Sequence, residues 1–137
     1  RDLLEQQGEA PADALRMDWS AGRILAQAGR GGESVDVFRS ARDGFIQLGL
    51  AAEAGQISLD LALSLLQLGR IAELKEVAQE MLPIFRSRLL HAEALAAIEF
   101  FREAVMAETI TAGQIHAVAD FLVRLESDKT ARFKRPS

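Results

Sequence analysis

Few side chains in this sequence combine the residue types and the spacing that catalysis or metal binding needs. The two histidines, His91 and His116, fall on different predicted helices, and only His116 has a carboxylate, Asp120, one helical turn away. Two such ligands are fewer than a zinc site requires. Glu99 and Glu103 are also one turn apart and resemble an acid and base pair, although a solvated helix face accounts for them. We therefore predict surface or structural roles for these residues.

Nucleotide binding and nucleophilic catalysis are not indicated by the sequence either. Glycines cluster at Gly29, Gly31 and Gly32, but no strand precedes them and no lysine stands in the frame of a phosphate-binding loop. A turn between two helices explains this cluster. No nucleophile, base and orienting residue can be picked out together, and cysteine and tyrosine are absent. We predict a protein that is not an enzyme, with no catalytic residues, no metal site and no cofactor.

The size and charge of the chain narrow the class of protein further. A chain of 137 residues suits one domain with a sizeable core, and the lack of cysteine excludes disulfides and fits the cytoplasm, where we place the protein. The net charge of -4 disfavours nucleic acid as a partner, because binding phosphates needs a clustered cationic face. Only the basic C-terminal tail over residues 127–137 approaches such a face, through Lys129, Arg132, Lys134 and Arg135.

Nothing in the sequence points to a membrane. No apolar run has the length that crosses a bilayer, and the first residues lack a signal-peptide pattern, so we expect no membrane partner. The chain begins at Arg1 in place of methionine, and residues 1–8 look like the end of a helix already under way. We therefore interpret the chain as a fragment of a longer protein, and its function as that of a module.

An internal repeat of forty residues organises the chain. The first two units match without a gap at Ala12 and Ala52, Ala14 and Ala54, Leu25 and Leu65, Gln27 and Gln67, Gly29 and Gly69, Arg30 and Arg70, Glu33 and Glu73, Val37 and Val77, and Phe45 and Phe85. The third unit is degenerate and matches at Leu90, Ala92, Glu93 and Ala94. Repeats of this length indicate stacked supersecondary units that bury a shared core.

Within each unit the apolar residues recur with helical spacing, and Gly29 and Gly69 fall where one helix must end and the next begin. The predicted helices are Pro11–Ala28, Gly32–Leu48, Leu50–Leu68, Ile71–Ser87, Leu89–Glu108 and Ala112–Glu126. Pro83 is expected to bend the fourth of them without breaking it. Short loops make neighbouring helices antiparallel. We predict one all-α domain over residues 1–126, with units at 11–49, 50–88 and 89–126.

Small and large residues stand at defined positions of each unit, where a small residue opposite a large one permits close helix packing. These positions are Gly22, Leu25, Gly29, Ser34, Phe38 and Ala41 in the first unit, Ala62, Leu65, Gly69, Leu74, Ala78 and Met81 in the second, and Arg102, Val105, Thr109 and Gln114 in the more polar third. The pattern resembles the tetratricopeptide repeat family, in a long version. The resemblance implies a right-handed superhelical stack of antiparallel helix pairs, with about six to seven helices.

The same resemblance implies a binding scaffold whose first helix in every pair lines a concave face. Polar residues facing inward would hold an extended peptide or a partner helix. The inward candidates are Arg16, Trp19, Arg23, Gln27, Gln56, Asp60, Gln67, Glu99 and Glu103. Arginine and tryptophan are common interface anchors. Trp19 is explained equally well as a core residue, and for Arg16 and Arg23 a pair of solvated helix charges is the stronger alternative.

Two other functions stay open beside a scaffold for a protein or peptide partner. The chain would also suit an effector-sensing or regulatory module of a larger bacterial signalling or transcription protein, which the parent sequence would identify. It would equally suit a self-association domain, since a solenoid with open ends leaves apolar faces on its first and last helices. A homodimer formed through those terminal helices would be seen by sedimentation.

Overall fold

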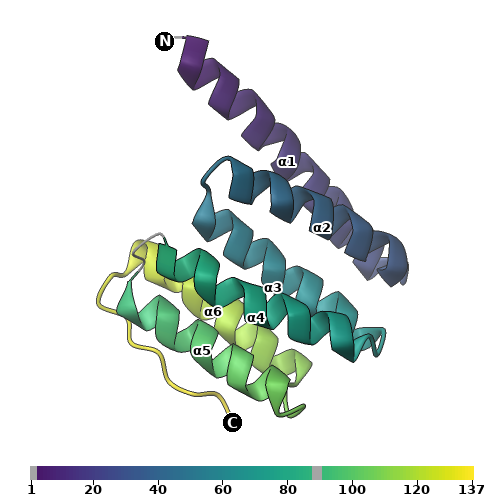
Figure 1. The fold of residues 1–137 in the computed structure, drawn as a ribbon, viewed down its shortest axis with the longest axis vertical. Helices are drawn as coiled ribbons and strands as arrows, with labels where there is room; N and C mark the ends of the chain where they lie inside the picture. The colour runs from purple at the N-terminus through teal and green to yellow at the C-terminus, as the bar shows by residue number, and fades with distance from the viewer. Residues whose placement is uncertain (1–2, 88–90) are drawn as a thin grey trace. The chain divides into compact units, whose positions relative to one another are not determined.

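The computed structural model describes residues 3–87 and 91–137 of the chain. Within these residues it contains six α-helices and no strand (Figure 1). The helices are α1 (Leu3–Gln27), α2 (Gly31–Gln47), α3 (Ala51–Gln67), α4 (Ile71–Ser87), α5 (Ala92–Met106) and α6 (Ala112–Ser127). The prediction of an all-α chain is therefore confirmed for the described residues. The bounds of α2, α3, α4 and α6 agree with the predicted ones to within one residue.

The first helix differs from the prediction of a helix starting at Pro11 after an earlier one over residues 1–8. In the structure α1 begins at Leu3 and continues through Pro11 to Gln27. A proline inside a helix removes one backbone donor, but its fixed φ is a helical value, so the chain can stay helical on both sides. Pro83 likewise lies within α4, which continues to Ser87 as expected.

Glycine turns end the first three helices in the same way. Gly29, Gly49 and Gly69 have positive φ angles of 78°, 76° and 72°, a conformation that glycine adopts without a side-chain clash. The next residue after each glycine donates its N–H to a carbonyl five residues back, at 2.9 Å. The turn after α5 repeats this hydrogen bond, but Glu108 takes the left-handed position with a φ of 57°. The third unit has therefore kept the turn and lost its glycine.

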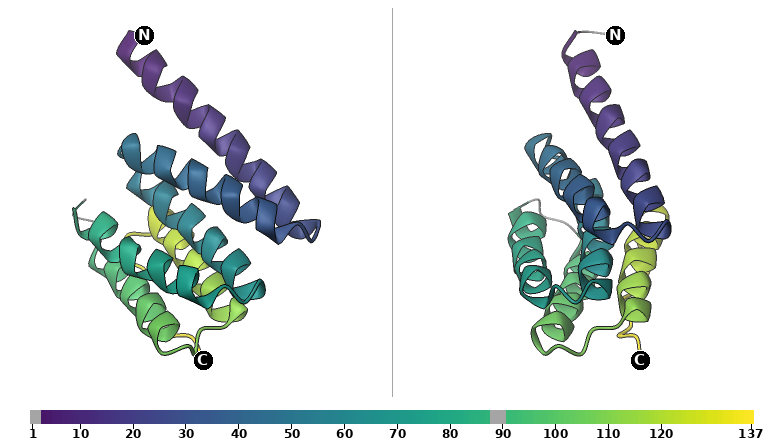
Figure 2. Two further views of the ribbon diagram at one scale, coloured as in Figure 1. Left: turned by 45° about the vertical axis from the view of Figure 1, so that its right-hand side comes forward. Right: turned by 90° about the vertical axis from the view of Figure 1, so that its right-hand side faces the viewer.

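Close contacts between small and large residues set the packing of α1 on α2. A Cβ atom added to Gly22 on α1 would lie 2.6 Å from Cε1 of Phe38, and one added to Gly44 on α2 would lie 2.6 Å from Cδ2 of Leu15. The two contacts run in opposite directions along the two helices, so α1 and α2 are antiparallel. The predicted pairing of Gly22 with a large residue is confirmed. The N-terminal part of α1 extends beyond α2 (Figures 1 and 2).

The chain divides into two compact units, Arg1–Ser64 and Leu65–Ser137, and the division falls within α3. The fully buried large side chains of the first unit include Val35, Phe38, Phe45, Ile57, Leu59 and Leu61. A buried pair of hydroxyls, Ser34 on α2 and Ser64 on α3, lies 3.2 Å apart in the same unit. In the second unit α5 packs against both α4 and α6. Its fully buried large side chains include Leu65, Leu74, Met81, Ile98, Phe101 and Ile115.

Candidate functional site

The structure brings three of the predicted partner-binding residues together on the first unit. Trp19 and Arg23 of α1 both donate to the same oxygen of Asp60 on α3, the indole Nε1 at 2.7 Å and the guanidinium Nε at 2.9 Å. The Arg23 guanidinium also lies over the Trp19 ring, 4.7 Å from its centroid. These three groups form the tryptophan cluster, which is fixed by hydrogen bonds and a cation–π contact.

Trp19 is half-buried, with one part of its ring in the core and another at the surface. One edge of its ring meets the fully buried Phe45 of α2, with ring centroids 5.8 Å apart and planes at 72°. Such an edge-to-face contact is favourable for aromatic rings. The indole N–H points instead to Asp60. Trp19 therefore joins the core to the polar surface of α1 and α3.

Arg16 forms a second link between α1 and α3 in the same unit. Its Nη2 atom lies 3.1 Å from a Glu53 carboxylate oxygen, and its Nη1 atom lies 3.0 Å from Asp13. Arg16 and Arg23 are seven residues apart on α1, and so are Glu53 and Asp60 on α3, so each pair lies on one side of its helix. The two arginine side chains remain 49% and 55% exposed. The equal spacing of seven residues on α1 and α3 therefore places the Arg16–Glu53 and Arg23–Asp60 ion pairs on the same side of the two helices.

The predicted glutamines behave differently from the arginines. Gln27 and Gln67 are exposed and Gln56 is half-buried. Among the described residues no side-chain hydrogen bond is formed by any of the three. The three glutamines therefore remain predicted partner-binding residues.

Glu99 and Glu103, the predicted acidic candidates on α5, lie in the second unit. Glu99 is 3.7 Å from Arg86 of α4, and Glu103 is 3.1 Å from Arg135 of the C-terminal segment. All four side chains are about half-exposed or more, so these ion pairs are worth about 0 to 1 kcal/mol each. The two carboxylates thus have separate cationic partners.

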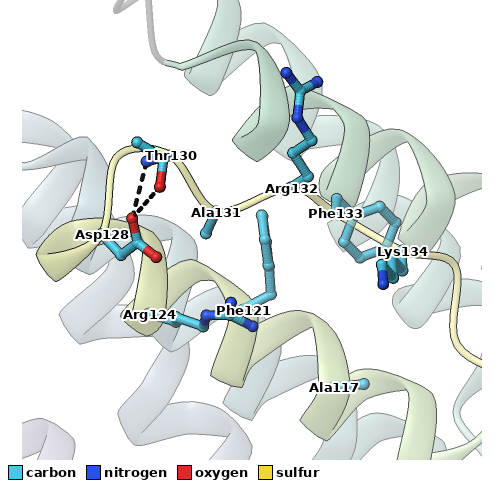
Figure 3. Close-up of a pocket in the computed structure, with 9 residues that line it drawn as sticks. All are labelled: Ala117, Phe121, Arg124, Asp128, Thr130, Ala131, Arg132, Phe133 and Lys134. Carbon is cyan, nitrogen blue, oxygen red and sulfur yellow. Dashed lines mark hydrogen bonds between the residues drawn. The ribbon is translucent and has the colours of Figure 1, made fainter.

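The basic C-terminal residues are attached to the second unit. After α6 the chain turns at Asp128, whose carboxylate accepts the hydroxyl and the N–H of Thr130, at 2.6 and 3.0 Å (Figure 3). The Thr130 hydroxyl hydrogen bond, followed by the backbone one, holds the pKa of Asp128 below its ordinary value. Further on, Ala131 is buried and the Phe133 ring packs on α5 and α6. The segment is therefore more than a solvated cationic tail.

Both histidines are exposed, and within residues 3–87 and 91–137 hydrogen bonds are found for His91 alone of the two. Its Nδ1 atom caps α5 by accepting the Glu93 N–H at 3.0 Å, and its Nε2 atom lies 2.9 Å from the carbonyl of Lys129. Since Nδ1 accepts, Nε2 carries the proton and donates it to that carbonyl. His116 is exposed. No group of three or more metal-binding side chains occurs among the described residues.

A shallow pocket of about 430 Å³ lies between α6 and the C-terminal segment (Figure 3). It is lined by Ala117, Phe121, Arg124, Asp128, Thr130, Ala131, Arg132, Phe133 and Lys134. The charged head groups of Arg132 and Lys134 make no ion pair with any side chain that the structure describes. The segment is thus incompletely packed on the side that faces this pocket.

Several of these contacts were missed at the level of sequence. Glu53 and Glu93 occupy equivalent positions of the repeat, and each holds a group from a distant segment, Arg16 in one unit and the Phe133 N–H in the other. The match of these two glutamates in the forty-residue repeat could have indicated their shared role. The aromatic residue inside the basic tail was another, because a phenylalanine there has no role in a purely electrostatic contact.

The described residues define a class of protein: an all-helical chain with polar clusters on its surface. No helix in the described ranges has both the length and the apolar content to cross a membrane. Comparisons with family models, with curated proteins and with solved structures find no match for this chain.

Proposed function

We propose that this chain is a protein-interaction module and not an enzyme, built as a tetratricopeptide-like superhelical stack of helix pairs. The binding site in this proposal is the α1/α3 surface, which consists of Arg16, Trp19, Arg23, Glu53 and Asp60. This surface lies on the concave side of the proposed stack and binds an acidic peptide or an acidic face of a partner helix. The repeated turns at Gly29 and Gly69 support the repeat architecture. The observation that carries the binding function is the arrangement of Arg23 on Trp19 and Asp60.

The chemistry of the tryptophan cluster favours recognition of a carboxylate. Arg23 uses its Nε for Asp60, and its two Nη groups make no hydrogen bond to any described residue. A guanidinium already held over an indole and hydrogen-bonded through Nε loses less conformational freedom when its two Nη groups bind a ligand carboxylate. Arg16, which is also half-exposed, adds a second positive group on the same side of α1. An extended acidic segment would meet both.

Exchanging Arg16 and Arg23 together for glutamine should weaken binding of an acidic ligand roughly tenfold, since charge-assisted hydrogen bonds to its carboxylates are lost. A labelled synthetic peptide rich in glutamate serves as the probe, measured by fluorescence anisotropy at several salt concentrations. Binding to the native chain should also fall as salt rises. Glutamine is preferable to glutamate here, because a new carboxylate would face Glu53 and Asp60 and disturb the fold.

The matched control for this experiment is Arg102→Gln. Arg102 is an exposed arginine of α5 that has no polar partner among the described residues. It should leave peptide binding unchanged. Equal affinities of the native chain and the Arg16→Gln, Arg23→Gln variant would rule out the α1/α3 surface as the binding site.

A second candidate function, association through α1, is favoured by an exposed apolar stripe. Its residues recur at heptad spacing on the side of α1 opposite Gly22 and Trp19, and all are exposed. They are Ala10, Ala14, Met17, Ala21 and Ile24, with Met17 74% and Ile24 66% exposed. A helix that is apolar on two opposite sides is normally covered on both. A second copy of the chain, pairing through α1, would cover this stripe.

Sedimentation velocity tests the association directly. The native chain should form dimers whose population grows with concentration, and Met17→Glu with Ile24→Glu should return it to a monomer, because two charges would be buried in the interface. Val123→Glu is the matched control, since Val123 is a 55% exposed apolar residue of α6 outside the stripe. A native chain that stays monomeric at all concentrations rules out self-association through α1.

A further inference from the structure

The C-terminal segment lies against α5 and α6 in the way that an extended peptide lies in a groove. The Phe133 ring packs between two aromatic rings, with centroids 5.7 Å from Phe100 of α5 and 5.3 Å from Phe121 of α6. Both of those phenylalanines are buried. The aromatic side chain of the segment therefore occupies a place between two helices, with one phenylalanine from each.

Two further contacts hold the backbone of the segment and so do not depend on its side chains. The Phe133 N–H donates to the Glu93 carboxylate at 2.6 Å, and the Lys129 carbonyl accepts from His91 at 2.9 Å. His91 and Glu93 are joined to each other by the helix cap described above. Any extended chain entering this groove would find the same donor and acceptor.

A third contact selects a cationic side chain two positions after the aromatic one. The Arg135 guanidinium lies 3.1 Å from Glu103 and 5.7 Å from the centroid of the Phe100 ring. Side chains at positions i and i+2 of an extended chain point to the same side. Phe133 and Arg135 therefore form a two-residue signature, an aromatic residue followed by arginine with one residue between.

The segment is held in a manner that allows exchange. The ion pair of Arg135 with Glu103 is exposed, at 67% and 57%, and exposed pairs contribute little to stability. The pocket beside Phe121 leaves one side of the segment without packing partners (Figure 3). Regions with few buried contacts are those that open most easily. The Arg135 end is thus the least firmly held part of the segment, and release would begin there.

We propose that the α5/α6 groove is a recognition site for extended segments of partner proteins that carry an aromatic residue followed two positions later by arginine, and that the chain's own residues 128–135 occupy it in their absence. The occupying segment competes with the partner. Because it is tethered, its effective concentration is in the millimolar range, so a partner gains access only when it binds more tightly or when the segment is released. This proposal concerns a surface separate from α1/α3 and stands independently of that site.

A peptide added in trans tests the proposal on the whole 137-residue chain. The probe is a labelled synthetic peptide with the sequence of residues 127–137, measured by fluorescence anisotropy. The Phe133→Ala, Arg135→Ala variant of the same chain loses the signature, so its segment should leave the groove. We expect this variant to bind the peptide at least about tenfold more tightly than the native chain does, because the tethered competitor is gone.

Two substitutions, one in the probe and one in the protein, test whether the peptide binds in the α5/α6 groove. A probe in which alanine replaces Phe133 should lose its binding, and Glu103→Gln in the released variant should weaken binding of the native-sequence probe severalfold. Glu126→Gln is the control, since Glu126 is an exposed carboxylate of α6 that has no described partner. Equal binding of both probes, or no binding to a variant that keeps its helix content, would overturn the proposal.

A second variant keeps the test decisive if the loss of Phe133 disturbs folding. Arg135→Glu removes the ion pair with Glu103 and the cation–π contact with Phe100 and places a carboxylate beside Glu103, so it should weaken the hold of the whole segment and raise the fraction of molecules in which Phe133 has left the groove. Peptide binding should again exceed that of the native chain. Failure to bind here, in a folded protein, overturns the proposal. Exchange of the segment between two native copies, detected as a dimer that Phe133→Ala abolishes, would also overturn it in favour of a swapped dimer.

Discussion

Replacing Phe45 by alanine should lower the free energy of unfolding by about 3 to 5 kcal/mol, the largest effect expected of a single substitution in this chain. Phe45 has no exposed surface and meets the edge of the Trp19 ring. Truncation removes the apolar surface of the ring and leaves a cavity beside the tryptophan, and both losses destabilise the folded state. The measurement is urea unfolding followed by the fluorescence of Trp19, the only tryptophan in the chain.

Val123→Ala is the control for this prediction, because it also shortens an apolar side chain, but one that is 55% exposed. It should change the free energy of unfolding by less than about 0.5 kcal/mol. Phe45→Leu should fall between the two, since it retains part of the buried volume. A cost below about 1 kcal/mol for Phe45→Ala would contradict the packing of α1 on α2, because a truly buried phenylalanine costs more.

The second large effect is expected at Gly22, where leucine should destabilise the protein by about 1 to 3 kcal/mol through overpacking. Even the first atom of a side chain would lie 2.6 Å from Phe38, and Phe38 is itself only 1% exposed and has no room to move away. The helices would have to separate. Thermal and urea unfolding both report the change.

Gly32→Ala is the matched control for Gly22, since no atom lies within 4 Å of the added Cβ. Alanine should be neutral or stabilise by about 0.5 to 1 kcal/mol there, because glycine is a poor helix residue. Coupling gives a sharper test: Gly22→Ala combined with Phe38→Leu should cost less than the sum of the two single changes, since the smaller side chain relieves the clash. Strict additivity would mean that the two residues do not meet.

Much of the fold was accessible from the sequence because its determinants are local. The turn at Gly69 and the apolar phase of α4 lie within a few residues of each other, and helices form from such short-range patterns. The start of α1 was predicted wrongly at Pro11. A proline is a strong local signal for a helix start, yet it is compatible with a helix interior, and only the surrounding chain distinguishes the two.

The candidate site was predicted only in part. Helix periodicity placed Arg16, Trp19 and Arg23 on one side of α1, and the structure adds that Asp60 is hydrogen-bonded to two of them, Trp19 and Arg23. The role of Glu53 as the partner of Arg16 was missed. Which carboxylate meets which arginine depends on how far one helix is shifted along another, and no pattern within a single helix records that shift.

By itself the sequence determined the helices, their order and the turns between them, because backbone propensity and apolar spacing act over one or two helical turns. Only the tertiary structure decided which polar groups form hydrogen bonds or ion pairs with one another. Asp60 holds Trp19 from 41 residues away, and Glu93 holds the backbone of Phe133 from 40 residues away. Such contacts arise when packing brings distant segments within hydrogen-bonding distance, and that distance depends on the shapes of all the side chains between them.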